Sequence, residues 1–101
     1  MDLFRPTYEH GTITGFSYFC PGCFCDHFIN VAHPNSLGAK WSVTGPLSSP
    51  TVSPSIHVFY TDAKGNRNTQ CHHHVKDGKI QFLNDCMHDL RGQTIPLEPY
   101  I

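Results

Sequence analysis

Cys20-Pro21-Gly22-Cys23 is the stretch around which the rest of the chain is organised. Two cysteines three positions apart, with Pro and Gly between them, form a tight turn that can direct both thiolates at one metal ion. A redox pair is the alternative, but a redox Cys-x-x-Cys motif normally opens a helix in a βαβ unit. No helical pattern follows Cys23. We therefore expect Cys20 and Cys23 to bind zinc rather than to form a redox pair or to remain free thiols.

Strand-forming segments lie on both sides of this turn. Residues 12–19 are rich in β-branched and aromatic side chains, and residues 28–31 resume that pattern. Asp77-Gly78 predicts a tight hairpin turn, and residues 85–90 are compatible with one helical turn capped by Asn84 or Asp85. Further short strands are expected at residues 41–45, 55–60, 69–75, 80–83 and 94–97. The sequence thus predicts a mainly β fold: a small antiparallel hairpin or sandwich-like domain organised around one zinc site.

The composition is that of a small domain that needs help to stay folded. The chain has 101 residues, of which 39% are hydrophobic, below the roughly 45–50% of typical domains. A chain of this size is marginally stable unless a metal or a partner adds to its core. We predict a single zinc-binding, β-rich domain over residues 1–101.

The charge and the cysteine content argue against nucleic-acid binding and against a disulfide-stabilised protein. The formal net charge is −1 and no basic stripe is present, which argues against nucleic-acid binding. No apolar run is long enough for a membrane span and no signal peptide opens the chain, so we expect a cytoplasmic protein without a membrane partner. Five cysteines, an odd number, and eight histidines favour metal binding over a disulfide framework in that setting.

A closed tetrahedral zinc site needs two further ligands. Neighbouring residues of a strand point to opposite faces, so Cys71 and His73 should share one face and His72 and His74 the other. Cys71 and His74 have the spacing of a Cys-x-x-His knuckle, which requires the strand to break there. The residues alone leave eight candidates open: Cys25, His27, Cys71, His72, His73, His74, Cys86 and His88.

Asp85-Cys86-Met87-His88 is a second group of chemically capable residues. On the predicted helical turn Asp85 and His88 would lie on the same face. A carboxylate can fix the tautomer of an imidazole, either beside a metal or in an acid–base pair. The simpler alternative is an N-capping Asp85 and a surface His88.

Residues 50–55 carry several hydroxyl groups, among them Ser53 and Ser55. A serine nucleophile needs an adjacent base and an oxyanion hole. The sequence shows neither beside this segment. We therefore do not expect Ser53 or Ser55 to be catalytic.

Several segments together resemble a family of small phage and prophage proteins grouped as a domain of unknown function (DUF6527), whose members often carry the label "ammonia monooxygenase". That label is not transferred, because the enzyme of that name is a membrane-bound copper protein. The segments are Cys20-Pro21-Gly22-Cys23, Trp41, Pro50-Thr51-Val52-Ser53-Pro54-Ser55-Ile56, Cys71-His72, residues 75–83, Asp85-Cys86-Met87-His88 and residues 92–97.

The resemblance implies a phage or prophage origin, a location in the host cytoplasm and a zinc site. Cys71 and His72 occupy regular positions of the family pattern, so they are the favoured remaining zinc ligands, with His88 as their main competitor. If His88 binds the metal, the site could be open, with Asp85 supporting His88. Family members also resemble companions of bacterial ubiquitin-like conjugation genes, which suggests a modifier or adaptor role.

Two functions follow. The main prediction is a zinc-stabilised, non-enzymatic phage accessory protein that binds a host or phage macromolecule, most simply a protein. The alternative is a small zinc-dependent hydrolase with an open metal site, in which the metal activates water and His88 and Asp85 assist. The number of ligands to the metal distinguishes the two, because a structural site is closed by four protein ligands.

Overall fold

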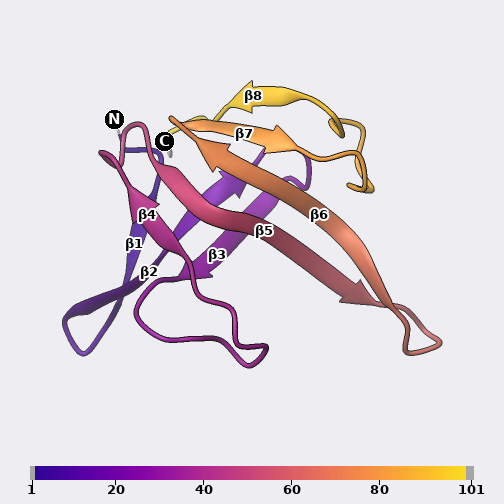
Figure 1. Ribbon diagram of the computed structural model, residues 1–101, viewed down its shortest axis with the longest axis horizontal. Helices are drawn as coiled ribbons and strands as arrows, with labels where there is room; N and C mark the ends of the chain where they lie inside the picture. Colours follow the sequence, from indigo (N-terminus) through magenta and orange to yellow (C-terminus); the bar gives the residue numbers. More distant parts are fainter. Residues whose placement is uncertain (1, 100–101) are drawn as a thin grey trace.

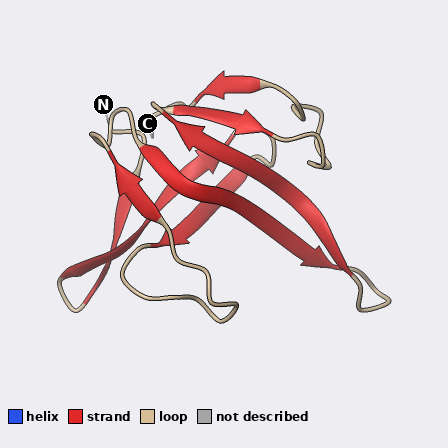
Figure 2. Cartoon of the chain, in the orientation of Figure 1, coloured by secondary structure: helices blue, strands red, loops and turns tan. Residues whose placement is uncertain are grey.

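The computed structural model describes residues 2–99, and these form eight strands in two antiparallel sheets (Figures 1 and 2). The three-stranded sheet has the order β1 (Arg5–Glu9), β2 (Thr12–Cys20), β3 (Cys25–Asn30). The five-stranded sheet has the order β4 (Ser42–Thr44), β5 (Thr51–Thr61), β6 (Arg67–Lys76), β7 (Lys79–Phe82), β8 (Thr94–Pro96). No helix occurs among the described residues, so the predicted mainly β fold is confirmed.

The hairpin turn at Asp77-Gly78 forms as the sequence predicts, whereas β5 has a different start. Asp77 and Gly78 have φ angles of 50° and 77°, and two positive φ values in a two-residue turn define the type I′ hairpin expected there. β5 begins earlier than predicted, at Thr51, although Pro54 lies inside it. A proline is tolerated there because the pairing of β5 with β6 is irregular between Val52 and Ile56.

The predicted helical turn over residues 85–90 is wrong. This loop after β7 runs alongside β6 instead: the backbone N–H of Leu83 donates to the His72 carbonyl at 2.9 Å, and that of Met87 donates to the Gln70 carbonyl at 3.2 Å. Backbone donors that bond a neighbouring strand are not available for a helix. The loop is thereby held against the strand that carries three consecutive histidines.

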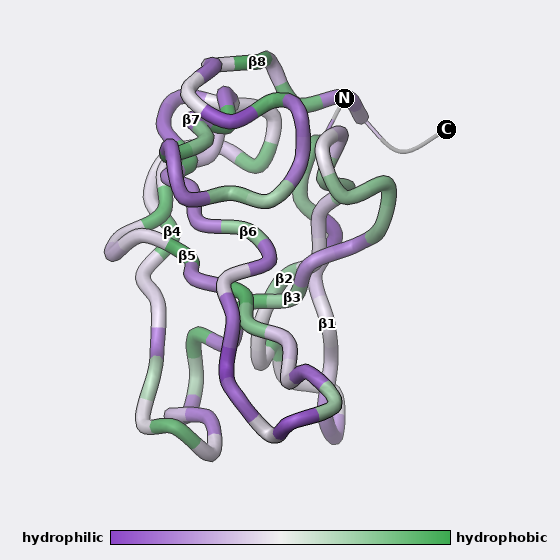
Figure 3. The backbone as a smooth tube through the Cα atoms, turned by 90° about the vertical axis from the view of Figure 1, so that its right-hand side faces the viewer, coloured by the Kyte–Doolittle hydropathy of each residue, from purple (hydrophilic) through white to green (hydrophobic). Residues whose placement is uncertain are grey.

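The core lies between the two sheets, which Figure 1 shows one behind the other and Figure 3 shows side by side. Tyr18 of β2 is fully buried, stacks on Phe4 with ring centroids 5.0 Å apart, and places its hydroxyl 2.6 Å from His73 Nε2 of β6. Val75, Ile80 and other apolar residues complete the same cluster. No helix long and apolar enough to cross a membrane is present within residues 2–99.

Strand β6 has two chemically different faces. Cys71, His73 and Val75 are buried against the core, whereas His72 and His74 lie on the other face. This confirms the predicted alternation of the histidine run. One strand therefore supplies side chains to two separate places, one inside the molecule and one at its surface.

Candidate functional site

Three cysteines and one histidine meet at the inner face of β6. Cys20 ends β2, Cys23 lies in the turn that follows, Cys71 is on β6 and His88 is in the loop after β7. One ligand atom from each of the four lies within 4.8 Å of all the others. We call this group the metal cluster. Cys20 and Cys71 are fully buried, and Cys23 and His88 are partly exposed.

The spacing of the metal cluster fits a tetrahedral ion. Metal–sulfur bonds of about 2.3 Å and metal–nitrogen bonds of about 2.0–2.1 Å give a tetrahedral sulfur–nitrogen edge of about 3.6 Å. His88 Nε2 lies 3.5 Å from Cys71 Sγ. These groups are thus within metal-binding distance without any rearrangement of the strands.

The turn at residues 20–24 is shaped around His88. The backbone N–H of Cys23 donates to Cys20 Sγ at 3.4 Å, and that of Phe24 donates to the Cys20 carbonyl at 2.9 Å. A Cβ atom on Gly22 would lie only 2.2 Å from the imidazole ring of His88. Glycine is therefore required at this position so that the ring can approach the cysteine pair.

The three thiols of the metal cluster compete for protons. A hydrogen bond from Cys71 lowers the pKa of Cys20 to about 3. The pKa of Cys71 is raised by that same pairing and by burial, and burial raises the pKa of Cys23 to about 11. One thiolate is favoured at the expense of the other two. A divalent cation would remove this conflict, because metal-bound thiols are deprotonated.

Two buried histidines lie beside the metal cluster. His73 Nδ1 is 3.2 Å from Cys71 Sγ, and burial lowers the pKa of His73 to about 3, so its ring is neutral. His27 stacks on His73 with centroids 5.3 Å apart, and its buried Nε2 has no hydrogen-bond partner among the described residues. His27, Cys71 and His73 form a second group within metal-binding distance. Cys25 and His74, by contrast, are exposed.

The outer face of β6 carries a different arrangement. Ser55 Oγ of β5 lies 3.2 Å from His72 Nε2, and His72 Nδ1 lies 3.0 Å from an Asp85 carboxylate oxygen. A hydroxyl, an imidazole and a carboxylate are thus joined by two hydrogen bonds, in the order found in a Ser-His-Asp triad. We call these three residues the triad.

Irregular pairing brings Ser55 to His72. The register of β5 and β6 jumps from Val52↔Val75 to Ile56↔His73, so residues 53–55 form an irregular segment. Such irregularities re-aim side chains next to active sites. The indole N–H of Trp41 also donates to the Ser55 carbonyl at 3.2 Å, which fixes the backbone of the serine.

Cys86 places the carboxylate of Asp85. The Cys86 thiol donates to the His72 carbonyl at 3.1 Å, and its sulfur accepts the His72 backbone N–H at 3.2 Å. The residue before Cys86 is therefore held directly beside the His72 ring. The hydrogen bond to His72 lowers the pKa of Asp85, so its carboxylate is ionised at neutral pH.

His57 stacks on one face of the His72 ring. The two rings stack with centroids 4.2 Å apart and an interplanar angle of 8°, and His57 Nε2 is 2.7 Å from Thr69 Oγ1. Burial, followed by the neighbouring His72, lowers the pKa of His57. A neutral, anchored ring at this place restricts rotation of the His72 imidazole.

The structure thus brings together four of the five residues predicted as metal ligands, Cys20, Cys23, Cys71 and His88, and places His72 elsewhere. His72 and Cys71 are consecutive in a strand and so point to opposite faces. The expected pairing of Asp85 with His88 is also replaced, because the carboxylate binds His72. Ser55 is the functional candidate that the sequence did not predict, because the sequence does not show that His72 lies beside it. The metal-ligand assignment itself remains a prediction.

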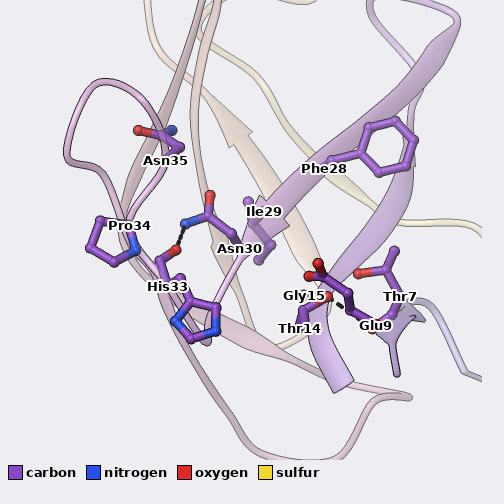
Figure 4. Close-up of a pocket in the computed structure, with 10 residues that line it drawn as sticks. All are labelled: Thr7, Glu9, Thr14, Gly15, Phe28, Ile29, Asn30, His33, Pro34 and Asn35. Atoms are coloured by element: carbon purple, nitrogen blue, oxygen red, sulfur yellow. Dashed lines mark hydrogen bonds between the residues drawn. The ribbon is translucent and has the colours of Figure 1, made fainter. Parts of the chain in front are cut away.

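A cavity of about 330 Å³ lies away from both groups, between the β1–β2 hairpin and the end of β3 (Figure 4). Its lining includes Glu9, Phe28 and Asn30 but no member of the metal cluster or the triad. Asn30 has a structural task there: its side-chain amide donates to the carbonyls of His33 and, at 2.9 Å, Ala39. It thereby anchors the loop that leads from β3 to β4.

Comparison with protein families gives one match. A family model described as "Bacterial ubiquitination-like system serine protease (BubE)" matches residues 4–83. The matched segment contains Ser55 and His72 and ends just before Asp85. No match was found among the curated proteins or among the solved structures.

This match corrects two predictions. The assignment to the phage and prophage DUF6527 family is wrong, because the family model that matches is BubE. The prediction of a non-enzymatic phage accessory binding protein is wrong for the same reason, since the family is one of serine proteases, and the hydrolase alternative fits better. The match spans most of the sequence, and the chain therefore belongs to the BubE family of bacterial ubiquitination-like system serine proteases.

Proposed function

We propose that this protein is a serine protease with Ser55 as nucleophile, His72 as general base and Asp85 as the residue that orients the base. The observation that carries the proposal is the continuous chain of contacts from Ser55 Oγ through both nitrogens of His72 to Asp85. The family match supports the same class of enzyme. A serine nucleophile is preferred over metal-activated water because Asp85 is engaged with His72 and not with His88.

The chemistry follows from the positions of these groups. Ser55 Oγ attacks the carbonyl carbon of the scissile peptide bond while His72 Nε2 accepts its proton and Asp85 stabilises the resulting imidazolium. His72 then gives the proton to the leaving nitrogen as the C–N bond breaks, which leaves an ester on Ser55. Water attacks this ester, His72 accepts a proton from the water and returns it to Ser55 Oγ, and the carboxylic acid product departs.

We also propose that Cys20, Cys23, Cys71 and His88 hold one zinc ion. Three thiolates and one imidazole are a typical donor set of closed, structural zinc sites. Two observations support this set: the His88 ring lies where a Gly22 side chain would be, and His88 Nε2 lies 3.5 Å from Cys71 Sγ. When bound, zinc would supply folding energy by joining β2, β6 and the loop after β7. It would take no part in peptide cleavage, which occurs on the other face of β6.

The substrate proposed from the family description is a protein component of a bacterial ubiquitination-like system. Cleavage of a peptide or isopeptide bond within such a component would use the chemistry given above. The host or phage protein predicted as a partner from the sequence stays a prediction; in this proposal the protein partner is the substrate.

Labelling with a fluorophosphonate tests the triad directly, because such probes form a covalent bond only with an activated serine. Purified protein should be labelled at Ser55, as located by peptide mass spectrometry, and Ser55→Ala should abolish labelling. Ser53→Ala is the matched control, since Ser53 is exposed and belongs to the same irregular segment. Equal labelling of Ser55→Ala and the unmodified protein would refute the triad.

Elemental analysis tests the metal. About one zinc per chain is expected, lost in His88→Ala and retained in His72→Ala. The reverse result, with zinc lost only in His72→Ala, would show that the Cys71-His72 pair predicted from the sequence binds the metal after all.

A further inference from the structure

A cavity of about 290 Å³ opens directly beside the nucleophile. Its walls come from the loop between β3 and β4, from β5 and from the start of β6, and Ser55 is itself part of the lining. A peptide whose carbonyl carbon reaches Ser55 Oγ can place a neighbouring side chain in this cavity, because Ser55 is part of its lining. The volume lies at the lower limit of ligand pockets, which suits one or two amino-acid side chains.

The cavity wall near Ser55 is apolar. Leu37 is 63% exposed and Phe59 38% exposed, although both are large hydrophobic residues, and Trp41 lines the same cavity. The indole hydrogen bond to the Ser55 carbonyl fixes Trp41 relative to the triad. Exposed apolar surface that adjoins a nucleophile and is held in place is typical of a specificity pocket.

The charges of the cavity have one sign. Lys40 and Arg67 line it, and none of the described lining residues is acidic. The guanidinium carbon of Arg67 lies 4.9 Å from the centroid of the Phe59 ring, so a cation–π contact holds its charge at the cavity. The nearby carboxylate of Asp85 is already paired with His72.

A continuous stack of rings connects this positive charge to the triad. His72 stacks on His57 at 4.2 Å, the His57 and Phe59 centroids are 4.0 Å apart, and Arg67 covers Phe59. The base and the guanidinium therefore lie on one surface of β5 and β6. A substrate strand that crosses this surface meets Ser55, then apolar side chains, then a cation.

We propose that this cavity selects substrates that carry an apolar side chain next to the scissile bond and a carboxylate within a few residues of it. The proposal rests on the serine protease function proposed above. Leu37, Trp41 and Phe59 would contact the apolar side chain, and Lys40 and Arg67 would attract the carboxylate. Nothing in the family description specifies this preference.

Internally quenched peptides that differ at single positions test the proposal. One position carries Leu or Ser and another carries Glu or Lys, each moved through the positions that flank the cleaved bond. Because charge pairs at the rim of an interface contribute modestly, we expect Glu peptides to have a kcat/KM about 5–10 times that of Lys peptides. Peptides that are not cleaved are ranked by how well they protect Ser55 from the fluorophosphonate.

Arg67→Glu should reverse the preference between Glu and Lys peptides, and Arg67→Gln should abolish most of it. Lys76→Glu is the matched control: it makes the same charge change on the same strand, at its other end and outside the cavity. In Lys76→Glu the preference should be that of the unmodified protein. Added salt should also weaken the preference, because the charges are exposed.

The outcomes distinguish the two proposals. Labelling of Ser55 together with a preference that Arg67→Glu leaves unchanged overturns the cavity assignment and leaves the protease proposal intact. A preference for Lys over Glu peptides in the unmodified protein overturns it as well. Absence of both labelling and cleavage refutes the protease proposal, and the cavity assignment with it.

Discussion

The two faces of β6 carry two clusters that differ in almost every physical respect. The metal cluster is built around buried thiols, and its groups compete for protons. The triad is partly open to water, with side-chain exposures of 23% for His72 and 49% for Asp85, and its groups are mutually satisfied by hydrogen bonds. Yet both take one residue from β6, Cys71 or His72, and one from the loop after β7.

This difference indicates a division of labour. A small sandwich lacks the core to stabilise an exposed catalytic loop by packing alone. Here His88 ties that loop to the interior, while Asp85, three residues earlier, reaches the surface. Under the zinc and protease proposals, stability would depend on Cys71 and His88 and chemistry on His72 and Asp85, which are different residues of the same two segments.

The largest expected effect is the loss of a metal ligand. Structural zinc contributes about 10–16 kcal/mol in zinc-finger peptides, comparable with or greater than the roughly 5–15 kcal/mol of total stability of a domain. Cys23→Ser should therefore lose zinc and unfold, as measured by elemental analysis and circular dichroism. Cys25→Ser makes the same change at an exposed position two residues later and should have little effect. A folded, zinc-loaded Cys23→Ser variant would contradict the division described above.

The next effect tests whether the triad can fail alone. Asp85→Asn removes the charge that stabilises the His72 imidazolium and should lower kcat by about 10⁴-fold, as in other triads. Zinc content and melting temperature should stay unchanged, because Asp85 is outside the metal cluster. Asp89→Asn, at an exposed position in the same loop, serves as the control. If Asp85→Asn also lost zinc, the two faces of β6 would not be separable.

The smallest effect tests the close approach of the His88 ring to Gly22. Gly22→Ala places a methyl group where the His88 ring lies and should weaken zinc binding by about 10–100-fold, the range seen for residues that support metal ligands. Competition with a chromophoric chelator measures this change, and excess zinc should restore activity. Phe24→Ala, which alters a side chain of the same turn that is 81% exposed, should bind zinc normally. Unchanged zinc affinity in Gly22→Ala would remove the Gly22 contact as support for His88 as a ligand.

The strands were predictable because their signals are local. β-Branched and aromatic residues identify β2, Asp77-Gly78 identifies its hairpin, and side chains alternate between the two faces within a strand such as β6. The same alternation already separated Cys71 from His72, so assigning both to one metal conflicted with the predicted strand. The Asp85–His88 pairing failed because it relied on a helical turn, whereas the loop bonds to β6.

The triad was not predictable from residue types alone. The register of β5 with β6 shifts twice, between Val52 and Ile56 and between Val58 and Phe59, and these shifts determine which side chains of β6 lie near Ser55. Nothing local in the sequence specifies these shifts. The one available signal was a histidine directed away from the core, with a serine before it and an aspartate after it in the chain.

The shared loop also determines when the two clusters become complete during synthesis. A chain that grows from its N-terminus presents the cysteine pair, then Ser55, then Cys71 and His72, while both clusters still lack a member. Residues 85–88 supply the two missing side chains within a single turn of the loop. A nascent chain therefore lacks Asp85, which orients the base in the proposed triad, until the same few residues that close the metal cluster emerge.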